Sequence, residues 1–511
     1  MASNSCTGST PVPGTSSDRN VRAFFIVSIH HYLEGMVRQA ASIFFLLTIV
    51  SCSRHEVGDP KPVGPIPSAS QLAWHQMELN AFVHFTTNTF TDKEWGYGDE
   101  KPEIFNPMEF NADQWITAFK EAGFKGVILT CKHHDGFCIW PSKYTEHSVK
   151  NSPFKKDVVK EVSEACKRHG LKFGIYVSPW DRNHPAYGSP EYITYYRSQL
   201  KELFMNYGPI FEMWFDGARG GDGYYGGKNE KRSIDGSTYY DWPATLNLIR
   251  EQEPNVIFFS DAGPGVRWVG NERGVAGETN WNTITPDTLY AGKVGIENLL
   301  NTGSENGTHW IPAEVDVSIR PGWFYHARED SLVKTPEQLF EIYLTSVGRG
   351  STLLLNIPPD RRGLIHENDV KALKEWRAIM DQEFKTNLVL DADVTATSER
   401  GKKFSAAAVV DGDPETYWST PDDVTYASLE IALDKPKEVK YIVLQEYISL
   451  GQRVKGFTIE AWQDDAWQEV GYGTTVGYKR IVKIDPIITE KIQINITNSK
   501  ACPLISNVEI F

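Results

Sequence analysis

Three features are scarce in this chain of 511 residues, and each scarcity removes a class of explanation. Six cysteines with no Cys-x-x-Cys pair exclude a disulfide scaffold and give no zinc signature. A net charge of -14, with no basic cluster, argues against nucleic acid as a partner. The apolar run from Ile43 to Val50 is too short to span a bilayer, so a retained transmembrane helix is the poorer interpretation.

The composition is that of an ordinary globular protein with more than one domain. Hydrophobic residues make up 41% of the chain and charged residues 23%. Aromatic residues reach 12%, with 15 Trp and 22 Tyr. Because Trp and Tyr faces stack on the apolar C–H faces of sugars as well as filling cores, this content is a weak hint of a carbohydrate ligand.

The segment from Met36 to Cys52 has the pattern of a secretory signal. A basic start is followed by the short apolar run and by a small residue before cysteine. The segment resembles a bacterial lipoprotein signal, with Cys52 as the lipidated residue. We therefore predict an exported protein, periplasmic or anchored in the outer membrane, that touches the membrane only through a lipid. Residues 1–51 are then an upstream extension and signal, and the Gly/Pro/Ser-rich residues 52–70 a linker.

Residues 71–386 alternate between strand-like and helix-like runs. The strand-like runs are continuously apolar, as expected when both faces are covered: Ala81–Phe85, Gly126–Thr130, Phe173–Val177, Phe211–Phe215, Val256–Ser260 and Thr352–Ile357. Amphipathic helices are predicted at Ala112–Ala122, Lys156–His169, Pro190–Tyr207, Pro243–Gln252, Pro336–Val347 and Asn368–Phe384. The predicted fold class is α/β, a distorted (β/α)8-like TIM barrel whose last three units, within about 262–335, are irregular.

Residues 387–511 have a different character, with short β-rich runs separated by turn residues. The predicted strands are Ser428–Leu433, Tyr441–Gln445, Gly456–Trp462, Ile481–Ile484 and Lys491–Ile496. This pattern predicts a C-terminal all-β sandwich.

Asp216 is the most informative residue of the barrel. It ends the apolar run from Phe211 and is followed by Gly217. Side chains at the carboxyl ends of parallel strands line the active face of such sheets, so an acid at this point favours catalysis. The alternative is that Asp216 only caps the next turn.

Other strand ends carry polar and aromatic residues that converge on the same rim. They are His84 with Glu94 and Trp95, the His133–His134 pair, Tyr176, Trp180 and Trp214. Adjacent residues of a strand point in opposite directions, so only one of the two paired histidines is expected in a pocket unless a bulge intervenes. Metal binding by the pair is the rival interpretation, but adjacent residues chelate poorly and no third ligand is obvious.

Together these motifs resemble the α-L-fucosidases of glycoside hydrolase family 29. The resemblance covers residues 72–385 and rests on His84-Phe85, Glu94-Trp95, His133–Phe137, Trp214–Gly217 and Leu353–Pro358. It implies a retaining mechanism with Asp216 as the nucleophile. It also implies a fucose pocket formed by His84, Glu94, Trp95, His133, His134, Tyr176 and Trp214, with Trp323 as a looser match to an aromatic wall.

Retaining glycoside hydrolysis needs a second carboxyl group, about 5 Å from the first. The segment from Gly263 to Trp281 offers Glu272 and Glu278. Its Arg-Trp-Val-Gly-Asn-Glu pattern resembles the subgroup that prefers branched α-1,3/1,4-fucosyl linkages, in which the glutamate matching Glu272 is the acid/base. Glu278 stays as the reserve candidate, and either glutamate is alternatively a solvated loop residue.

The stretch from Val409 to Trp418 resembles the opening of a discoidin-type carbohydrate-binding module. In that fold the turn matching Asp411 and Asp413 often lies near a structural calcium, and oxygen-rich turns suit a hard cation. An Asp-Gly turn that merely feeds a strand explains the same residues equally well.

The sequence therefore predicts an exported, exo-acting α-L-fucosidase that needs no cofactor for catalysis and has no metal in its active site. Its expected partners are fucosylated oligosaccharides or glycoconjugates. Two alternatives remain: a fucose-binding, lectin-like protein whose catalytic site has decayed, and a retaining exo-glycosidase acting on a related sugar. A kept strand-end carboxylate, Asp216, argues against the lectin.

Overall fold

The computed structural model describes residues 58–390 and 392–511. The predicted signal and the predicted lipidation site, Cys52, lie outside the described residues. Within the described ranges, no helix is both long and apolar enough to cross a membrane.

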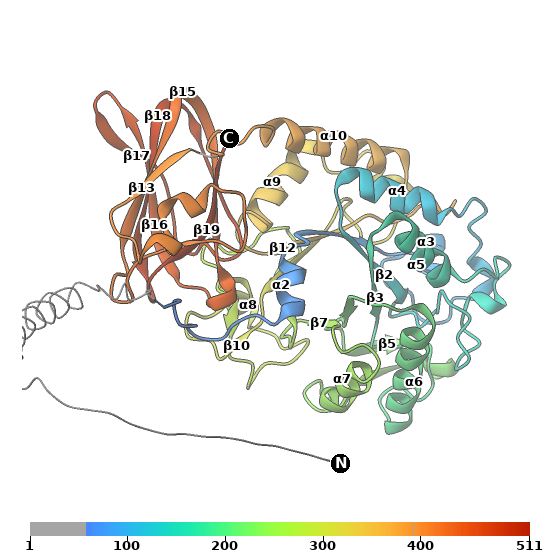
Figure 1. Cartoon of the computed structure of the whole chain (residues 1–511). Helices are drawn as coiled ribbons and strands as arrows, with labels where there is room; N and C mark the ends of the chain where they lie inside the picture. Colours follow the sequence, from blue (N-terminus) through green and yellow to red (C-terminus); the bar gives the residue numbers. More distant parts are fainter. Residues whose placement is uncertain (1–57, 391) are drawn as a thin grey trace, which may run out of the picture. The chain divides into compact units, whose positions relative to one another are not determined.

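Eight parallel strands close into a barrel, which confirms the predicted fold class (Figure 1). Around the barrel the order is β1, β12, β11, β8, β7, β4, β3 and β2. Their bounds are β1 Leu79–Val83, β2 Gly126–Lys132, β3 Lys172–Val177, β4 Glu212–Trp214, β7 Ile257–Ser260, β8 Val266–Trp268, β11 Ala313–Ser318 and β12 Thr352–Asn356. The carboxyl ends of all eight strands therefore lie at one end of the barrel.

The helices are α2 Ala69–His75, α3 Thr87–Thr91, α4 Ala112–Ala122, α5 Val158–His169, α6 Pro190–Tyr207, α7 Trp242–Arg250, α8 Glu297–Thr302, α9 Pro336–Ser346 and α10 Glu367–Glu383. Helices α4 and α6 have the predicted bounds, and the other predicted helices differ from the observed ones by one or two residues at an end. In α4 the Asn111 side chain accepts a hydrogen bond from the Gln114 N–H at the start of the helix, and left-handed Gly123 ends it. Trp115, Ile116 and Phe119 bury one face in the barrel core.

Two barrel strands, β8 and β11, were not predicted from the sequence. Strand β11 is hard to recognise because its residues alternate: Val315 and Val317 belong to the main hydrophobic cluster, while Glu314 and Asp316 are polar and also buried. The connection between β8 and β11 holds the short pair β9 (Thr283–Ile284) and β10 (His309–Trp310) and the short helix α8. The expectation of irregularity in 262–335 is therefore confirmed.

The C-terminal β-domain, residues 393–511, is an antiparallel all-β unit (Figure 1). Its strands are β13 Asp393–Ala396, β14 Trp418–Ser419, β15 Ala427–Glu446, β16 Val454–Gln463, β17 Ala466–Gly473, β18 Arg480–Ser499 and β19 Leu504–Ile510. The runs predicted as separate strands at Ser428–Leu433 and Tyr441–Gln445 are one strand, β15. Those at Ile481–Ile484 and Lys491–Ile496 are one strand, β18. The turn residues between them form register shifts rather than breaks.

The β-domain packs against the barrel through a shared apolar cluster. Tyr441 and Ile481 of the β-domain belong to the same buried cluster as Phe340 and Tyr343 of α9. Phe384, at the end of α10, stacks near Tyr441 with ring centroids 5.3 Å apart. Helix α9 also contacts the chain beyond Glu272, because the Ala276 N–H donates to the Thr345 carbonyl at 2.9 Å.

Candidate active site

Asp216 follows β4, and both of its carboxylate oxygens are held. The Ala218 N–H donates to Oδ1 at 2.6 Å and the Tyr176 hydroxyl donates to Oδ2 at 3.1 Å. The first bond is the turn cap that the alternative interpretation expects, but the second comes from β3. The carboxylate is therefore oriented by two strand ends and not by its own turn alone.

Three buried histidines surround this carboxylate in a neutral state. Burial lowers the pKa of His84 and of His134 to about 4. Burial also holds the pKa of His133 well below its usual range. At neutral pH each imidazole therefore carries one proton, and its position decides what the ring offers a ligand.

The neighbours of His84 fix its tautomer. The Asn356 amide nitrogen donates to Ser318 Oγ at 2.9 Å and to the Trp323 carbonyl at 2.9 Å. The Asn356 oxygen therefore accepts the 2.8 Å bond from His84 Nδ1–H. Nε2 of His84 is left as a hydrogen-bond acceptor.

The paired histidines have opposite tautomers. Ser178 donates its hydroxyl to the Trp180 carbonyl at 2.7 Å, so it accepts from His134 Nδ1–H at 2.7 Å, and Nε2 of His134 is an acceptor. His133 Nδ1 instead accepts from the Asn88 amide at 3.4 Å, which puts its proton on Nε2. Among the described residues no Nε2 atom of His84, His133 or His134 has a partner, and none is sealed from solvent.

Both paired histidines enter the site because the strand register breaks before them. The pairing of β2 with β3 shifts between Thr130 and Lys132, and β2 ends at Lys132. The two rings lie 4.0 Å apart; that of His133 stacks near Tyr176, and that of His134 faces Trp180. This is the bulge exception to the one-histidine expectation. No group of three metal-binding side chains occurs in the described ranges.

Glu94 ties the loop after β1 to the loop after β11. Its carboxylate accepts from the backbone N–H of Trp323 at 2.8 Å and of Phe324 at 3.2 Å. His326, which the sequence did not single out, lies 2.6 Å from the same carboxylate through Nε2 and 2.7 Å from Asp92 through Nδ1. These contacts place Glu94 near His84, where its negative charge partly offsets the lowering of the His84 pKa by burial.

Three tryptophans form apolar walls. Trp214 lies flat on Phe259, with ring centroids 3.9 Å apart and planes 7° from parallel. Trp323 faces His84 with centroids 5.4 Å apart. Trp95 is 55% exposed and sets its ring against His134. The buried Trp214 offers an apolar face suited to a bound sugar, and the exposed Trp95 offers one suited to the neighbouring sugar residue.

The segment from Trp268 to Glu272 is built so that its last residue enters this site. Trp268 Nε1 donates to Asp316 at 2.8 Å, and the Val269 N–H donates to the Glu314 carbonyl at 3.0 Å. Gly270 has a φ of +83° and a Cβ there would lie 2.3 Å from the Glu297 carbonyl, so only glycine fits. Asn271 closes the turn through the Arg273 N–H and the Val275 carbonyl.

The surroundings of Glu272 raise its pKa above the usual range of a glutamate. Burial raises its pKa, and the negative charges of Asp216 and Glu94 raise it further, while a hydrogen bond with Trp323 opposes them. These interactions bring Glu272, Asp216, Glu94 and Trp323 into one site.

Glu278 lies elsewhere, at the junction with the β-domain. Its carboxylate pairs with Arg349 and, at 2.8 Å, with Arg480 of β18. The Glu278 side chain is 64% exposed and its backbone carbonyl also accepts from Arg480. Both carboxylate oxygens of Glu278 are thus paired with arginines, which favours Glu272 as the acid/base.

Asp261 is a further acid at the rim that the sequence did not single out. It directly follows β7, as Asp216 follows β4, so the same strand-end signal was present. Its Oδ2 accepts from the Gly292 N–H at 2.6 Å and would lie 2.3 Å from a Cβ at Gly217. Burial and the charge of Asp216 raise its pKa to about 6. Asp261 therefore supports the turn that carries Asp216.

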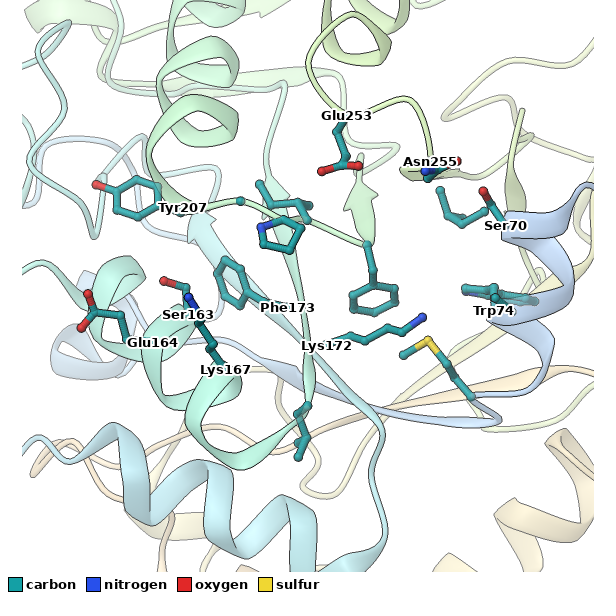
Figure 2. A pocket seen from close by; sticks show the side chains of 18 of the residues that line it. Ser70, Trp74, Ser163, Glu164, Lys167, Lys172, Phe173, Tyr207, Glu253 and Asn255 are labelled. Carbon is teal, nitrogen blue, oxygen red and sulfur yellow. The ribbon is translucent and has the colours of Figure 1, made fainter.

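A cavity of about 800 Å³ lies at the other end of the barrel (Figure 2). It is lined by Phe173 and Ile257, which stand at the amino-terminal ends of β3 and β7, and by Phe211, which precedes β4. Because Asp216 follows the carboxyl end of β4, this cavity is not the site of reaction.

The predicted calcium turn is an ordinary hydrogen-bonded turn in this structure. Asp411 accepts from the Asp413 N–H at 2.9 Å and from the Thr416 hydroxyl, and Asp413 accepts from the Glu415 N–H at 2.9 Å. These bonds are those of the Asp-Gly turn interpretation, and calcium binding there stays a prediction.

Comparison with known proteins agrees with this geometry. The family profile described as Alpha-L-fucosidase matches residues 63–383, and that described as F5/8 type C domain matches residues 393–509. Alpha-L-fucosidase 1 of Arabidopsis thaliana is 39% identical over 492 residues, covering 93% of this chain and 94% of the plant protein. Plasma alpha-L-fucosidase of Homo sapiens is 27% identical over 59% of this chain and 60% of its own length.

Solved structures give the same result. A glycoside hydrolase 29 family member from an unknown rumen bacterium is 43% identical with a TM-score of 0.79, covering 88% of this chain and 78% of that one. A Ruminococcus gnavus glycoside hydrolase family 29 fucosidase in complex with fucose is 31% identical with a TM-score of 0.80, covering 89% and 97%. The chain belongs to the α-L-fucosidases of glycoside hydrolase family 29 and carries a C-terminal F5/8 type C domain.

Proposed function

We propose that this α-L-fucosidase retains anomeric configuration, with Asp216 as the nucleophile and Glu272 as the acid/base. The observation that carries the proposal is the pairing of unlike carboxyl groups in one site. Asp216 is held by two hydrogen-bond donors, whereas burial and nearby negative charge raise the pKa of Glu272. Retaining enzymes need one carboxylate that attacks and one carboxylic acid that protonates the leaving group.

The chemistry proceeds in two steps. An Asp216 oxygen attacks the anomeric carbon of fucose while Glu272 gives its proton to the glycosidic oxygen, and the bond to the leaving sugar breaks. Glu272, now ionised, takes a proton from water, which attacks the same carbon and releases Asp216. The Tyr176 hydroxyl, 3.1 Å from Asp216 Oδ2, stabilises the carboxylate as it departs.

The three histidines fit the hydroxyl groups of a terminal sugar. Nε2 of His84 and of His134 accept hydrogen bonds, so each pairs with a sugar O–H, while Nε2–H of His133 donates to a sugar oxygen. A ligand lacking one of these hydroxyls leaves a buried nitrogen unpaired, which costs affinity and gives specificity. Trp214 and Trp323 supply the apolar faces for the ring.

The covalent step is tested by trapping. A fucosyl fluoride bearing fluorine at C2 forms the glycosyl-enzyme quickly and releases it slowly. We expect the intact protein to gain the mass of one fluorofucosyl group, and the peptide containing Asp216 to carry it. A label on another carboxylate, or turnover without any trapped species and with inverted product, would contradict the proposal.

A preference for α-1,3/1,4-linked fucose beside a galactose is proposed for the leaving group. It is supported by the Arg267–Glu272 segment, which resembles the branched-linkage pattern, and by the exposed Trp95 at the edge of the pocket. Binding energy from the neighbouring galactose then lowers the barrier at the reacting bond. Release of fucose from Lewis-type trisaccharides is expected to exceed that from α-1,2-linked trisaccharides; equal rates would refute the preference.

Export and lipidation at Cys52 are proposed on the sequence pattern of Met36–Cys52 alone. Expression of the full chain in a Gram-negative host with a labelled fatty acid tests both. The label is expected on the protein and is expected to be lost in Cys52→Ala. A wild-type chain that stays unlabelled and uncleaved would refute lipidation.

A further inference from the structure

Strand β11 faces the barrel interior with three polar residues, although barrel interiors are usually filled by apolar side chains. Ala313, Val315 and Val317 point outward into the main hydrophobic cluster. Glu314, Asp316 and Ser318 alternate with them and are buried. The interior around them also holds the buried Glu212 of β4, which interacts with Glu314, and an apolar cluster that includes Trp214, with Trp268 and Trp323 packed against it.

Each of these polar residues is linked to one tryptophan of the site by hydrogen bonds, directly or through Asn356. Glu314 Oε1 accepts from Trp214 Nε1–H at 3.0 Å, and Asp316 Oδ1 accepts from Trp268 Nε1–H at 2.8 Å. Ser318 acts through Asn356, whose amide donates to Ser318 Oγ and to the Trp323 carbonyl. The three tryptophans come from β4, from β8 and from the loop after β11, so a single strand aligns three separate parts of the rim.

Asp316 has the most direct link to the reaction. Trp268, which it holds, begins the segment that ends at Glu272, and Val269 is fastened to the same strand through the Glu314 carbonyl. A change in the position of Trp268 is therefore passed to Glu272 over four residues. Asp316 also lies close enough to Glu272 and Glu314 for their charges to act on it.

We propose that Asp316 is a positioning residue for the fucosidase reaction, which sets Trp268 and thereby the acid/base segment through its hydrogen bond and not through its charge. The role rests on the proposed assignment of Glu272. Burial, with the charges of Glu272 and Glu314 added, holds the pKa of Asp316 well above its usual range. The Trp268 N–H needs only an acceptor at this position, which an Asp316 oxygen supplies.

Substitutions can remove the ionisable group and the hydrogen-bond acceptor of Asp316 one at a time. Asp316→Asn keeps an acceptor of the same size and removes only the ability to ionise. Asp316→Leu keeps the bulk and removes the acceptor, leaving the buried indole N–H of Trp268 unpaired. Trp268→Phe removes the donor. Val315→Ala, on the outward face of the same strand, is the matched control for weakening β11 without touching a tryptophan.

Kinetics on an aryl α-L-fucoside over a range of pH provide the first measurement. Asp316→Asn is expected to retain kcat/KM within about threefold and to keep the alkaline limb of the pH profile in place. Asp316→Leu is expected to lose about 10-fold to 100-fold in kcat/KM, the scale of a small misplacement of a reacting group. The double variant Asp316→Leu/Trp268→Phe is expected to lose no more than the worse single variant, because both act through one bond.

A spectroscopic measurement keeps the test independent of activity. In protein labelled with 5-fluorotryptophan, Trp268→Phe identifies one fluorine resonance among the 15 tryptophans. That resonance is expected to move in Asp316→Leu and to stay in Asp316→Asn and Val315→Ala. If Asp316→Leu does not fold, the pH profile and spectrum of Asp316→Asn still decide the question.

Two results would overturn the proposal. A loss in Asp316→Asn as large as in Asp316→Leu, or an alkaline limb shifted to lower pH, would show that the charge or proton of Asp316 is used. An unchanged Trp268 resonance in Asp316→Leu would show that Asp316 does not position it. An error in the assignment of Glu272 itself is recognised separately, by the absence of azide rescue in Glu272→Ala.

Discussion

The two halves of the barrel build the site by different means. The half from β1 to β4 has regular strand–helix units, and the residues at its strand ends are neutral histidines, Tyr176, Trp214 and Asp216. The half containing β7, β8 and β11 has long loops and brings four acids with raised pKa values to the barrel, namely Asp261, Glu272, Glu314 and Asp316, and Glu212 of β4 is the acid of the first half that contacts Glu314. The first half is suited to binding a neutral sugar, and the second to holding a proton near a carboxylate.

The difference has a physical cause. A neutral sugar is recognised by fixed donors and acceptors, and regular strands hold these with little mobility. A general acid must keep its proton near neutral pH, which requires burial and like charge around it. Long loops that fold back over the barrel bury Glu272, the proposed acid, and contacts with α9 and the β-domain hold these loops from outside.

The strongest test of the first half is Asp216→Ala. Without the nucleophile no glycosyl-enzyme forms, so turnover is expected to fall by at least about 10³-fold for every leaving group. Steady-state rates on an activated aryl fucoside and on a natural trisaccharide provide the measurement. Asp222→Ala, an exposed acid in the hairpin that follows, is the matched control. Loss confined to one class of substrate would place the nucleophile elsewhere.

Glu272→Ala tests the second half and is expected to depend on the leaving group. Substrates that need protonation should lose about 10²-fold to 10⁴-fold in kcat/KM, while activated aryl fucosides, which leave without a proton, should lose far less in the first step. Added azide should restore turnover of the activated substrate and give β-fucosyl azide. Glu278→Ala, six residues away, removes the contact with Arg480 and is expected to show no azide rescue. Rescue of Glu278→Ala with none for Glu272→Ala would reverse the assignment.

Removal of one negative charge near Glu272 should move the pH profile without removing either proposed catalytic group. The charge of Glu94 raises the pKa of Glu272, so in Glu94→Gln the ionised form of Glu272 is less opposed and its pKa falls. The protonated acid is then lost at lower pH, and the alkaline limb of kcat should shift to lower pH. Glu278→Gln should leave the limb in place. A shift to higher pH would show that Glu94 acts on a different group.

The sequence predicted the regular half better than the irregular one, for reasons visible in particular residues. The run from Phe211 to Phe215 is apolar except for Glu212 and is followed by Asp216, so both the strand and the site residue were recognisable. β11 alternates apolar and acidic residues in a barrel interior, a pattern that does not indicate a strand buried on both faces. Asn356 lies in a motif that carried the family resemblance, but its role depends on neighbours from β1 and β11.

Glu272 and Glu278 lie in one loop, and their local sequence does not show which of them enters the site. Both are glutamates in a loop, and only a family resemblance distinguished them from the sequence. Their surroundings differ because residues over 70 positions away, Arg349 and Arg480, claim Glu278. The local sequence does not show such long-range partners, so the choice between the two glutamates required the three-dimensional structure.

The smallest expected effect concerns the support that the β-domain gives to the second half. Arg480 donates to the Glu278 carboxylate and carbonyl, each at 2.8 Å, and Thr475 accepts from the Asn280 N–H at 2.9 Å. These bonds hold the chain a few residues beyond Glu272. Arg480→Leu should therefore lower kcat/KM severalfold, with the larger loss on substrates that need protonation, while inhibition by free fucose changes little because the first half is intact. Arg168→Leu, which removes a surface ion pair with Asp113 on the α4 and α5 side, is the matched control. If Arg480→Leu weakened fucose binding as much as it slowed poor leaving groups, the two halves would not act separately and the division drawn between them would fail.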